Sequence, residues 1–281
     1  MKVLVTGVKG QLGYDVVREL NERKIECVGA DVEDFDITDR RQTFGFIENC
    51  MPDAIIHCAA YTAVDRAEDD EEKCRAVNAD GTENIALCAK EIGAKMVYIS
   101  TDYVFGDEGD NFLEVDFEKN PKNVYGKTKL LGEEAVIKNV EKSFIVRTSW
   151  VFGKNGGNFV RTMMRVGSQN EEVRVVADQI GSPTYTYDLS KLLCDMIMTE
   201  KYGVYHATNE GVCSWAEFCE EIFSFASIKS KVNHITTEQY PTKAKRPKNS
   251  RLSKSCLDRA GFKRLPPWQN ALERYLKEIE E

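Results

Sequence analysis

Apolar positions in the first half of the chain follow two alternating periods. Short apolar runs predict β-strands at MKVLVTG (1–7), IECVGAD (25–31), DAIIHCAA (53–60), KMVYIST (95–101) and SFIVRTSWVFG (143–153). Helical apolar spacing predicts helices between them, at 11–22, 39–50, 64–92 and 121–139. Strands separated by helices pair in parallel through right-handed crossovers. The pattern therefore predicts an α/β fold with a doubly wound parallel sheet.

After about residue 150 this rhythm loosens. Glycines cluster at GKNGGN (153–158), a turn is expected at GSPT (181–184), and short helical segments stand between irregular pieces. We expect residues 1–150 to form a dinucleotide-binding domain. Residues 151–281 are expected to form mainly a smaller C-terminal substrate-binding lobe, with some segments returning to the first domain.

Composition excludes several classes of protein. The 281 residues are 42% hydrophobic, but no apolar run approaches the roughly 20 residues of a membrane span, and no leader precedes the first strand. A cytoplasmic protein without membrane contact is expected. The net charge of −8 argues against nucleic-acid binding. Nine cysteines without a C-x-x-C pair, and three histidines without ligand spacing, predict no metal site.

A glycine-rich turn joins the first strand to the first helix. LVTGVKGQLG places Gly7, Gly10 and Gly13 three residues apart. A dinucleotide pyrophosphate needs close backbone approach and a helix N-terminus, and glycines at such a turn permit both. The flanking strand and helix make the signal specific, so the sequence predicts a Rossmann-type nucleotide site rather than a tight turn without a ligand.

An acidic segment follows the second strand. Asp31 ends this strand, eighteen residues after Gly13, where an acid can accept hydrogen bonds from the adenosine ribose. Asp34 and Asp36 compete for this role, and Asp36 with Ile37 would approach the adenine if a strand ended there. ADVEDFD holds four carboxylates and no cation. NADH is therefore predicted as the preferred cofactor, with NADPH possible because exposed charges are screened within about 8 Å.

Two Tyr-x-x-x-Lys pairs compete for a catalytic role, so spacing alone decides nothing. Tyr125 and Lys129 begin a helix after the strand that ends at Thr101, whereas Tyr187 and Lys191 lie in the looser half. A tyrosine is a useful acid at neutral pH when a nearby cation stabilises its phenolate. The first pair predicts carbonyl reduction, in which Tyr125 supplies the proton and Thr101 hydrogen-bonds the carbonyl oxygen.

One basic stretch interrupts the acidic chain. TKAKRPK (242–248) concentrates four cations, and an isolated cluster of this kind is either a solvated loop or a contact for an anionic small molecule. We expect Arg246 to hold a substrate diphosphate, because guanidinium binds phosphate in a bidentate manner.

TGVKGQLG, STDYVF and VYGKTK together resemble the extended short-chain dehydrogenases/reductases. AAYTAVDRAE (59–68), RTSWVFG (147–153) and YPTKAKRPKNSRL (240–252) resemble the dTDP-4-dehydrorhamnose reductase family within that group, and the similarity covers nearly the whole chain. The resemblance implies NAD(P)H-dependent reduction of the C4 ketone of dTDP-4-dehydro-L-rhamnose. It also implies that Thr101, Tyr125 and Lys129 form the catalytic set.

The resemblance assigns further positions. Gln11 and Leu12 fall on the pyrophosphate turn, and Ala60, Tyr61 and Thr62 follow a strand that passes the cofactor. Asn78 either supports the active-site strand or takes part in a proton relay. Asp102, Tyr103 and Trp150 would contact the sugar. Some family members dimerise through a metal bridged by acidic residues, but no such cluster is evident here, and either a monomer or a homodimer is expected.

Two alternatives stay open at this point. One is a reductase or epimerase of another nucleotide sugar, since spacing does not reveal the contacts that select base and sugar. The other is a non-catalytic regulatory subunit on the same fold. The intact Thr, Tyr and Lys set favours an enzyme.

Overall fold

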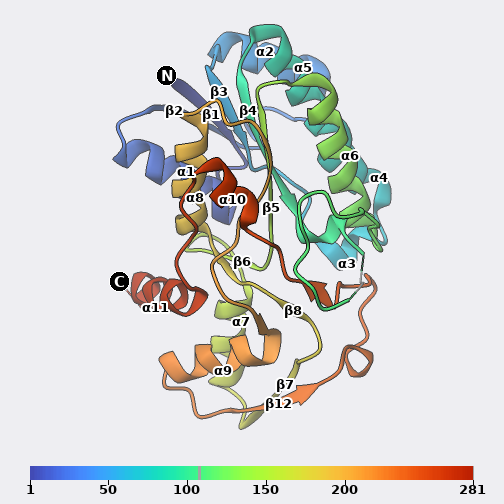
Figure 1. The fold of residues 1–281 in the computed structure, drawn as a ribbon, viewed down its shortest axis with the longest axis vertical. Helices are drawn as coiled ribbons and strands as arrows, with labels where there is room; N and C mark the ends of the chain where they lie inside the picture. Colours follow the sequence, from blue (N-terminus) through green and yellow to red (C-terminus); the bar gives the residue numbers. More distant parts are fainter. Residues whose placement is uncertain (107–108, 281) are drawn as a thin grey trace.

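The structure, a computed structural model, describes residues 1–106 and 109–280. Its centre is a six-stranded sheet in the order β10-β5-β4-β3-β1-β2, in which all neighbouring strands run parallel. The strands are β1 (Lys2–Thr6), β2 (Glu26–Ala30), β3 (Ala54–His57), β4 (Lys95–Thr101), β5 (Ser143–Thr148) and β10 (Gly203–His206). The predicted α/β fold with a doubly wound parallel sheet is confirmed (Figure 1).

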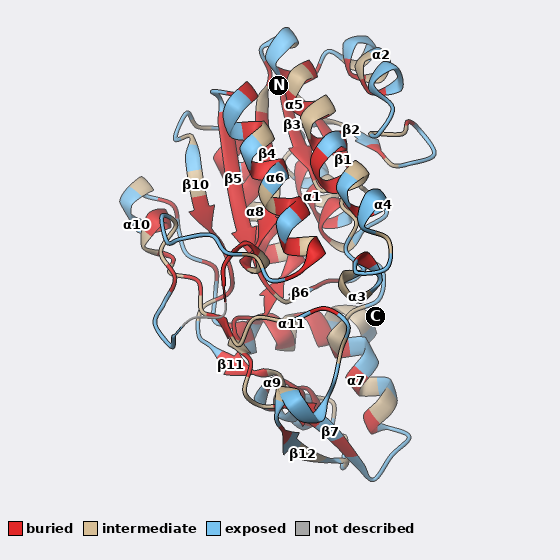
Figure 2. Cartoon of the chain, turned by 90° about the vertical axis from the view of Figure 1, so that its right-hand side faces the viewer, coloured by how far each residue is buried: buried red, intermediate tan, exposed pale blue. Residues whose placement is uncertain are grey.

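Helices cover both faces of this sheet. On one face α1 packs against α8, and on the other α5 packs against α2 and α6 (Figure 1). Their bounds are α1 (Gln11–Glu22), α2 (Arg40–Cys50), α5 (Thr82–Ile92), α6 (Val124–Asn139) and α8 (Thr186–Ile197). Each face holds its own apolar core, and Figure 2 shows β4 and β5 buried between the layers. Burial on both faces explains why these strands read as continuous apolar runs.

The order of the strands positions the ligand site. From β1 the chain passes outward to β2 and then returns to β3 on the other side of β1. The connections after β1 and β3 therefore leave in opposite directions and open a crevice at the carboxyl ends of the strands. Open α/β sheets bind ligands at such a switch point.

Two predicted elements are interrupted. The expected helix at 64–92 is divided into α3 (Val64–Ala67), α4 (Glu71–Arg75), a π-helical turn (Ala76–Gly81) and α5. The expected strand at 143–153 breaks after Thr148, because Trp150 adopts a left-handed φ of 50° before β6 (Val151–Phe152) begins. Both breaks lie beside the crevice, since Val77 of the π-helical turn and Trp150 both line it.

The second half forms a smaller cluster around α7 (Phe159–Gly167), α9 (Trp215–Phe225) and α11 (Trp268–Glu280), which share an apolar core. Its strands are β7 (Glu172–Val176), β8 (Ile180–Gly181), β9 (Thr184–Tyr185), β11 (Cys213–Ser214), β12 (Lys231–Ile235) and β13 (Asn249–Ser250). α8, β10 and α10 (Ser255–Ala260) instead pack in or on the central sheet. Division of the chain into two domains at residue 150 stays a prediction.

Candidate active site

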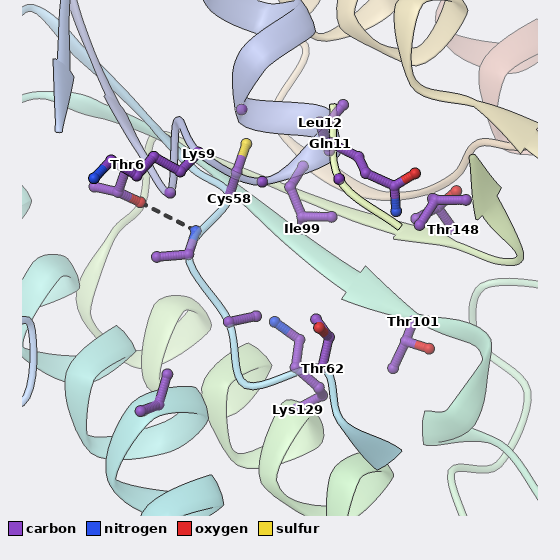
Figure 3. Close-up of a pocket in the computed structure, with 18 of the residues that line it drawn as sticks. Thr6, Lys9, Gln11, Leu12, Cys58, Thr62, Ile99, Thr101, Lys129 and Thr148 are labelled. Carbon is purple, nitrogen blue, oxygen red and sulfur yellow. Dashed lines mark hydrogen bonds between the residues drawn. The ribbon is translucent and has the colours of Figure 1, made fainter. Parts of the chain in front are cut away.

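A cleft of about 760 Å³ opens at the carboxyl edge of the sheet. Residues that end four neighbouring strands line it: Gly7 after β1, Asp31 after β2, Ala59 after β3 and Thr101 on β4. Segment 148–151 and residues 156–158 complete the wall. Figure 3 shows Lys9, Gln11 and Leu12 on one side of the cleft and Thr62 and Lys129 on the other.

The glycine turn fits the backbone of a dinucleotide. Gly7 has a φ of +72°, and a Cβ there would come within 2.7 Å of the Ala59 backbone. A Cβ at Gly13 would lie 2.3 Å from the carbonyl oxygen of Gly7. Gly10 is the N-cap of α1 and no side chain caps the helix. The first N–H groups of α1 are thereby left for an anion, which is the arrangement that binds pyrophosphate.

The acids after β2 lie where the sequence places them. Asp31 lines the cleft, and its carboxylate accepts hydrogen bonds from the backbone N–H groups of Lys9 at 2.8 Å and Val32 at 2.9 Å. Asp36 and Ile37 also line the cleft. However, Asp36 stands in a turn rather than at a strand end, and accepts hydrogen bonds from Thr38. The fixed carboxylate of Asp31 is thus the better placed of the two to receive ribose hydroxyls.

Thr101, Tyr125 and Lys129 all line this cleft. Thr101 is the last residue of β4, and Tyr125 lies in the first turn of α6, which begins where the Asn123 side chain accepts a hydrogen bond from the Gly126 N–H at 2.7 Å. Lys129 is one turn further on, and its ammonium group lies 4.1 Å from the centre of the Tyr98 ring. Tyr187 and Lys191 lie on α8 and line no part of the cleft.

Burial changes the acidity of this set. It lowers the pKa of Lys129 to about 7, although the carboxylate of Glu133 opposes the shift. Burial also raises the pKa of the Tyr125 phenol, with Asp102 adding to the effect and a hydrogen bond with Thr101 opposing it. The Tyr125 phenol is therefore neutral at physiological pH, and Lys129, one helical turn further on, titrates near neutrality. Groups perturbed in this way are typical of catalytic sites.

The segment after β3 approaches the cleft from the other side. Ala60 and Thr62 line it, but Tyr61 and Asn78 do not. The Asn78 side chain accepts a hydrogen bond from the Tyr61 N–H at 2.8 Å and donates one to the Tyr61 carbonyl at 3.1 Å. This geometry favours a supporting role for Asn78 over a proton relay.

The residues assigned to the sugar line the cleft, whereas the residue assigned to the substrate diphosphate does not. Asp102, Tyr103 and Trp150 line the cleft, and the Trp150 ring stacks on Trp215 with 3.7 Å between ring centres. Arg246 does not line it. Its guanidinium instead forms a bidentate ion pair with Asp65, which follows β3 at the start of α3.

Several cleft residues were missed by the sequence reasoning. Lys9 lies between the first two glycines of the turn, and its ammonium group pairs with Glu33 at 2.6 Å. Its position inside the glycine motif is a usable signal in the sequence, although Lys9 lies outside the acidic segment ADVEDFD that it approaches. Gly156, Gly157 and Asn158 also line the cleft. They belong to GKNGGN, a glycine cluster to which the sequence analysis assigns no individual site residue.

Membrane-spanning helices and clusters of metal ligands are both absent from the described part of the chain. No helix there is long and apolar enough to cross a membrane. No group of three or more metal-ligating side chains occurs among the described residues.

A Rossmann sheet, a glycine turn and a Thr, Tyr and Lys set facing one cleft define an extended short-chain dehydrogenase/reductase. The family described as RmlD substrate binding domain matches residues 1–281, and the chain belongs to it. The spore coat polysaccharide biosynthesis protein SpsK of Bacillus subtilis is 40% identical over 277 residues, which cover 99% of this chain and 97% of that protein.

Two solved structures of relatives superpose closely. The dTDP-4-dehydrorhamnose reductase of Clostridium acetobutylicum has a TM-score of 0.98 and 40% identity, with both chains fully covered. The enzyme of the same name from Bacillus anthracis, in complex with NADP, has a TM-score of 0.96 and 44% identity over 99% of both chains.

Proposed function

We propose that this protein is an NAD(P)H-dependent oxidoreductase that reduces the C4 ketone of dTDP-4-dehydro-L-rhamnose to give dTDP-L-rhamnose. The observation that carries the proposal is the meeting of Thr101, Tyr125 and Lys129 in one cleft with the glycine turn. The names of relatives that align over nearly the full chain support the choice of substrate. A reduced nicotinamide, when bound, supplies the hydride for the ketone carbon.

The side chains divide the remaining work. Tyr125 donates its phenolic proton to the ketone oxygen, and the Lys129 ammonium group stabilises the phenolate that results. Trp150 and Tyr103 form walls against which the sugar is held. The Asp31 carboxylate accepts the adenosine ribose hydroxyls, while the N-terminus of α1 faces the pyrophosphate.

The direct test mixes purified protein, reduced nicotinamide and dTDP-4-dehydro-L-rhamnose, and follows the near-ultraviolet absorbance of the reduced cofactor. Loss of absorbance with formation of dTDP-L-rhamnose is expected. Turnover with another sugar nucleotide alone would show that the proposed substrate is wrong. Absence of turnover with every sugar nucleotide would point to a regulatory protein. The oligomeric state and a cytoplasmic location stay predictions.

Arg246 is proposed to hold the diphosphate of the substrate. It lies close enough to Tyr103, which lines the cleft, for each to shift the pKa of the other. To reach the diphosphate it must leave Asp65, to which it is bound by hydrogen bonds of 3.0 and 2.6 Å. Asp65 would then hold the guanidinium at the cleft margin until substrate arrives.

We expect Arg246→Lys to raise the KM for the sugar nucleotide roughly tenfold with little change in kcat, because lysine cannot make a bidentate phosphate contact. Asp65→Asn should lower the same KM by freeing Arg246. Steady-state kinetics measures both. Lys243→Met is the matched control, since Lys243 lies on the same loop as Arg246 and its exposed ammonium group pairs with Asp69, whose carboxylate is also exposed. An unchanged KM in Arg246→Lys would make this ion pair purely structural.

NADH is proposed as the preferred cofactor by a modest margin, with NADPH also used. The carboxylates of Asp31, Glu33 and Asp34 surround the strand end that would receive the extra phosphate of NADPH, and they repel it. Lys9 weakens this repulsion, because its ammonium group lies on Glu33 within the same cluster. The relative from Bacillus anthracis binds NADP, which agrees with use of both cofactors in the family.

Asp31→Ala should lower kcat/KM for NADH, because the ribose hydroxyls lose their acceptor. It should also reduce the difference in kcat/KM between NADH and NADPH, because repulsion of the NADPH phosphate falls. The measurement compares kcat/KM for both cofactors in each variant. Asp34→Ala separates the two effects: it removes a repelling charge from the same strand end, but Asp34 does not line the cleft, so it should raise kcat/KM for NADPH without lowering kcat/KM for NADH. An unchanged cofactor ratio in Asp31→Ala would remove Asp31 from the ribose site.

A further inference from the structure

Asp102 is a buried carboxyl group placed directly behind the catalytic threonine. It follows β4, and only 1% of its surface is exposed. One carboxylate oxygen accepts a hydrogen bond from the Thr101 hydroxyl at 2.9 Å. The other accepts one from the Ser250 hydroxyl at 2.5 Å, and Ser250 belongs to β13, which is paired with β8. Asp102 thus joins the active-site strand to the second half of the chain.

This arrangement fixes the direction of the Thr101 hydroxyl. A hydroxyl group has one proton to donate, and Thr101 gives it to Asp102. Its oxygen also accepts the Tyr103 N–H at 3.2 Å and lies next to the Tyr125 phenol. While Asp102 is ionised, Thr101 therefore has no proton left for a ketone oxygen, although a second donor there would stabilise the charge that develops during reduction.

We propose that Asp102 is a positioning residue whose protonation switches Thr101 from acceptor to donor, so that the reactive enzyme carries a neutral Asp102; this rests on the proposed function. A proton taken from solvent adds to the Asp102 oxygen that faces Thr101. The new carboxyl O–H then donates to the Thr101 oxygen, and the Thr101 hydroxyl turns its own proton towards the ketone. On ionisation the proton returns to solvent and the hydroxyl turns back.

The surroundings of Asp102 favour the neutral form. Burial raises its pKa to about 6, although the hydrogen bonds from Ser250 and Thr101 oppose the shift. The ionisable groups that face it from α6 and the turn after β4 are the phenols of Tyr125 and Tyr103, which are neutral. Arg246, the cation that acts on Tyr103, is paired with the Asp65 carboxylate. A substrate that covers the cleft excludes water and favours the uncharged carboxyl further.

The sign of the pH effect follows from this. Because the pKa of folded Asp102 is raised to about 6, the donor form of Thr101 is present below pH 6 and is lost as pH rises through it. We expect kcat/KM to fall roughly tenfold across this change, the factor for one hydrogen bond of ordinary strength. Lys129 also titrates, near pH 7. The ratio of wild-type to variant kcat/KM isolates the pH dependence that arises from Asp102, because the pH dependence that arises from Lys129 is the same in both proteins and cancels.

Asp102→Asn is the central variant. Its amide donates to Thr101 at every pH, so Thr101 stays a donor, and the ratio of wild-type to variant kcat/KM should fall roughly tenfold as pH rises through 6. Ser250→Ala removes a donor that stabilises the carboxylate, and should move the midpoint of the wild-type fall to higher pH. A ratio that does not vary with pH, or a midpoint that Ser250→Ala leaves in place, would overturn the proposal.

Asp15→Asn is a matched control. Asp15 is an equally buried carboxyl whose pKa is also raised to about 6 and which accepts a hydrogen bond from the Thr186 hydroxyl, but it does not line the cleft. Its replacement should leave the pH profile unchanged. If Asp15→Asn also abolished the fall of kcat/KM near pH 6, that fall would arise from the fold in general and not from Asp102, and the proposal would fail.

Titration of the aspartate carboxyl carbons by NMR gives a readout independent of turnover. The Asp102 signal, identified by its loss in Asp102→Asn, should titrate near pH 6 and move higher in Ser250→Ala. Titration in the ordinary aspartate range would contradict the proposal even in an active enzyme. Failure of the wild type to oxidise reduced nicotinamide with the sugar nucleotide would instead contradict the proposed function.

Discussion

Tyr125→Phe is expected to lower kcat by about 10²- to 10⁴-fold while leaving cofactor affinity close to that of the wild type, because general acid catalysis is typically worth this factor. The substitution removes the donated proton and keeps the ring. That ring packs edge-on against Tyr103, with 5.5 Å between ring centres, so the wall of the cleft is preserved. A loss confined to kcat would show that the phenol acts in the transition state.

The chain contains its own control for this experiment. Tyr187 and Lys191 repeat the Tyr-x-x-x-Lys spacing on α8, and Lys191 lies over the Tyr187 ring at 4.0 Å, but neither residue lines the cleft. Tyr187→Phe removes a hydrogen bond to Glu22 and should leave kcat unchanged. Near-normal kcat in Tyr125→Phe, or equal losses of kcat in Tyr125→Phe and Tyr187→Phe, would contradict the proposed mechanism.

The parts of the site that could be predicted are those fixed by local sequence. A residue that ends a strand of a parallel sheet must lie at the carboxyl edge, so Gly7, Asp31 and Thr101 could be placed together from the order of elements alone. The Tyr125 helix follows the same logic, since its start is set by a local cap at Asn123. These positions need only the pattern of strands and helices.

The remaining features depend on contacts between distant segments. Arg246 and Asp65 are 181 positions apart, and Ser250 and Asp102 are 148 apart. No periodicity brings such pairs together. The break at Trp150 has the same origin, because the chain turns there so that the Trp150 ring lies against Gly181 and Trp215. Tertiary packing overrides the local preference for a continuous strand at this point.

A buried ion pair between α6 and the central sheet also escaped prediction. Arg147 on β5 and Glu133 on α6 are each 1% exposed and share hydrogen bonds of 2.8 and 2.7 Å. Ser100 donates to the same carboxylate at 2.5 Å, and Arg147 donates to the Val115 carbonyl at 2.8 Å. Glu133 lies one turn after Lys129, so this pair anchors the helix that carries the proposed proton donor and its cation to the central sheet.

Arg147→Met should lower the free energy of unfolding by about 3–5 kcal/mol, the usual cost of removing one partner from a buried ion pair. Methionine fills much of the volume, so the loss arises chiefly from the Glu133 carboxylate, which is left without its counter-charge in a site closed to water. Urea unfolding measures the change.

The double variant Arg147→Met with Glu133→Leu should recover most of this loss, because it removes both charges. Lys277→Met, which breaks an exposed i,i+4 pair with Glu273, should leave the unfolding midpoint unchanged. A double variant no more stable than Arg147→Met alone would mean that packing around the guanidinium, rather than the uncompensated charge, sets the stability of this layer.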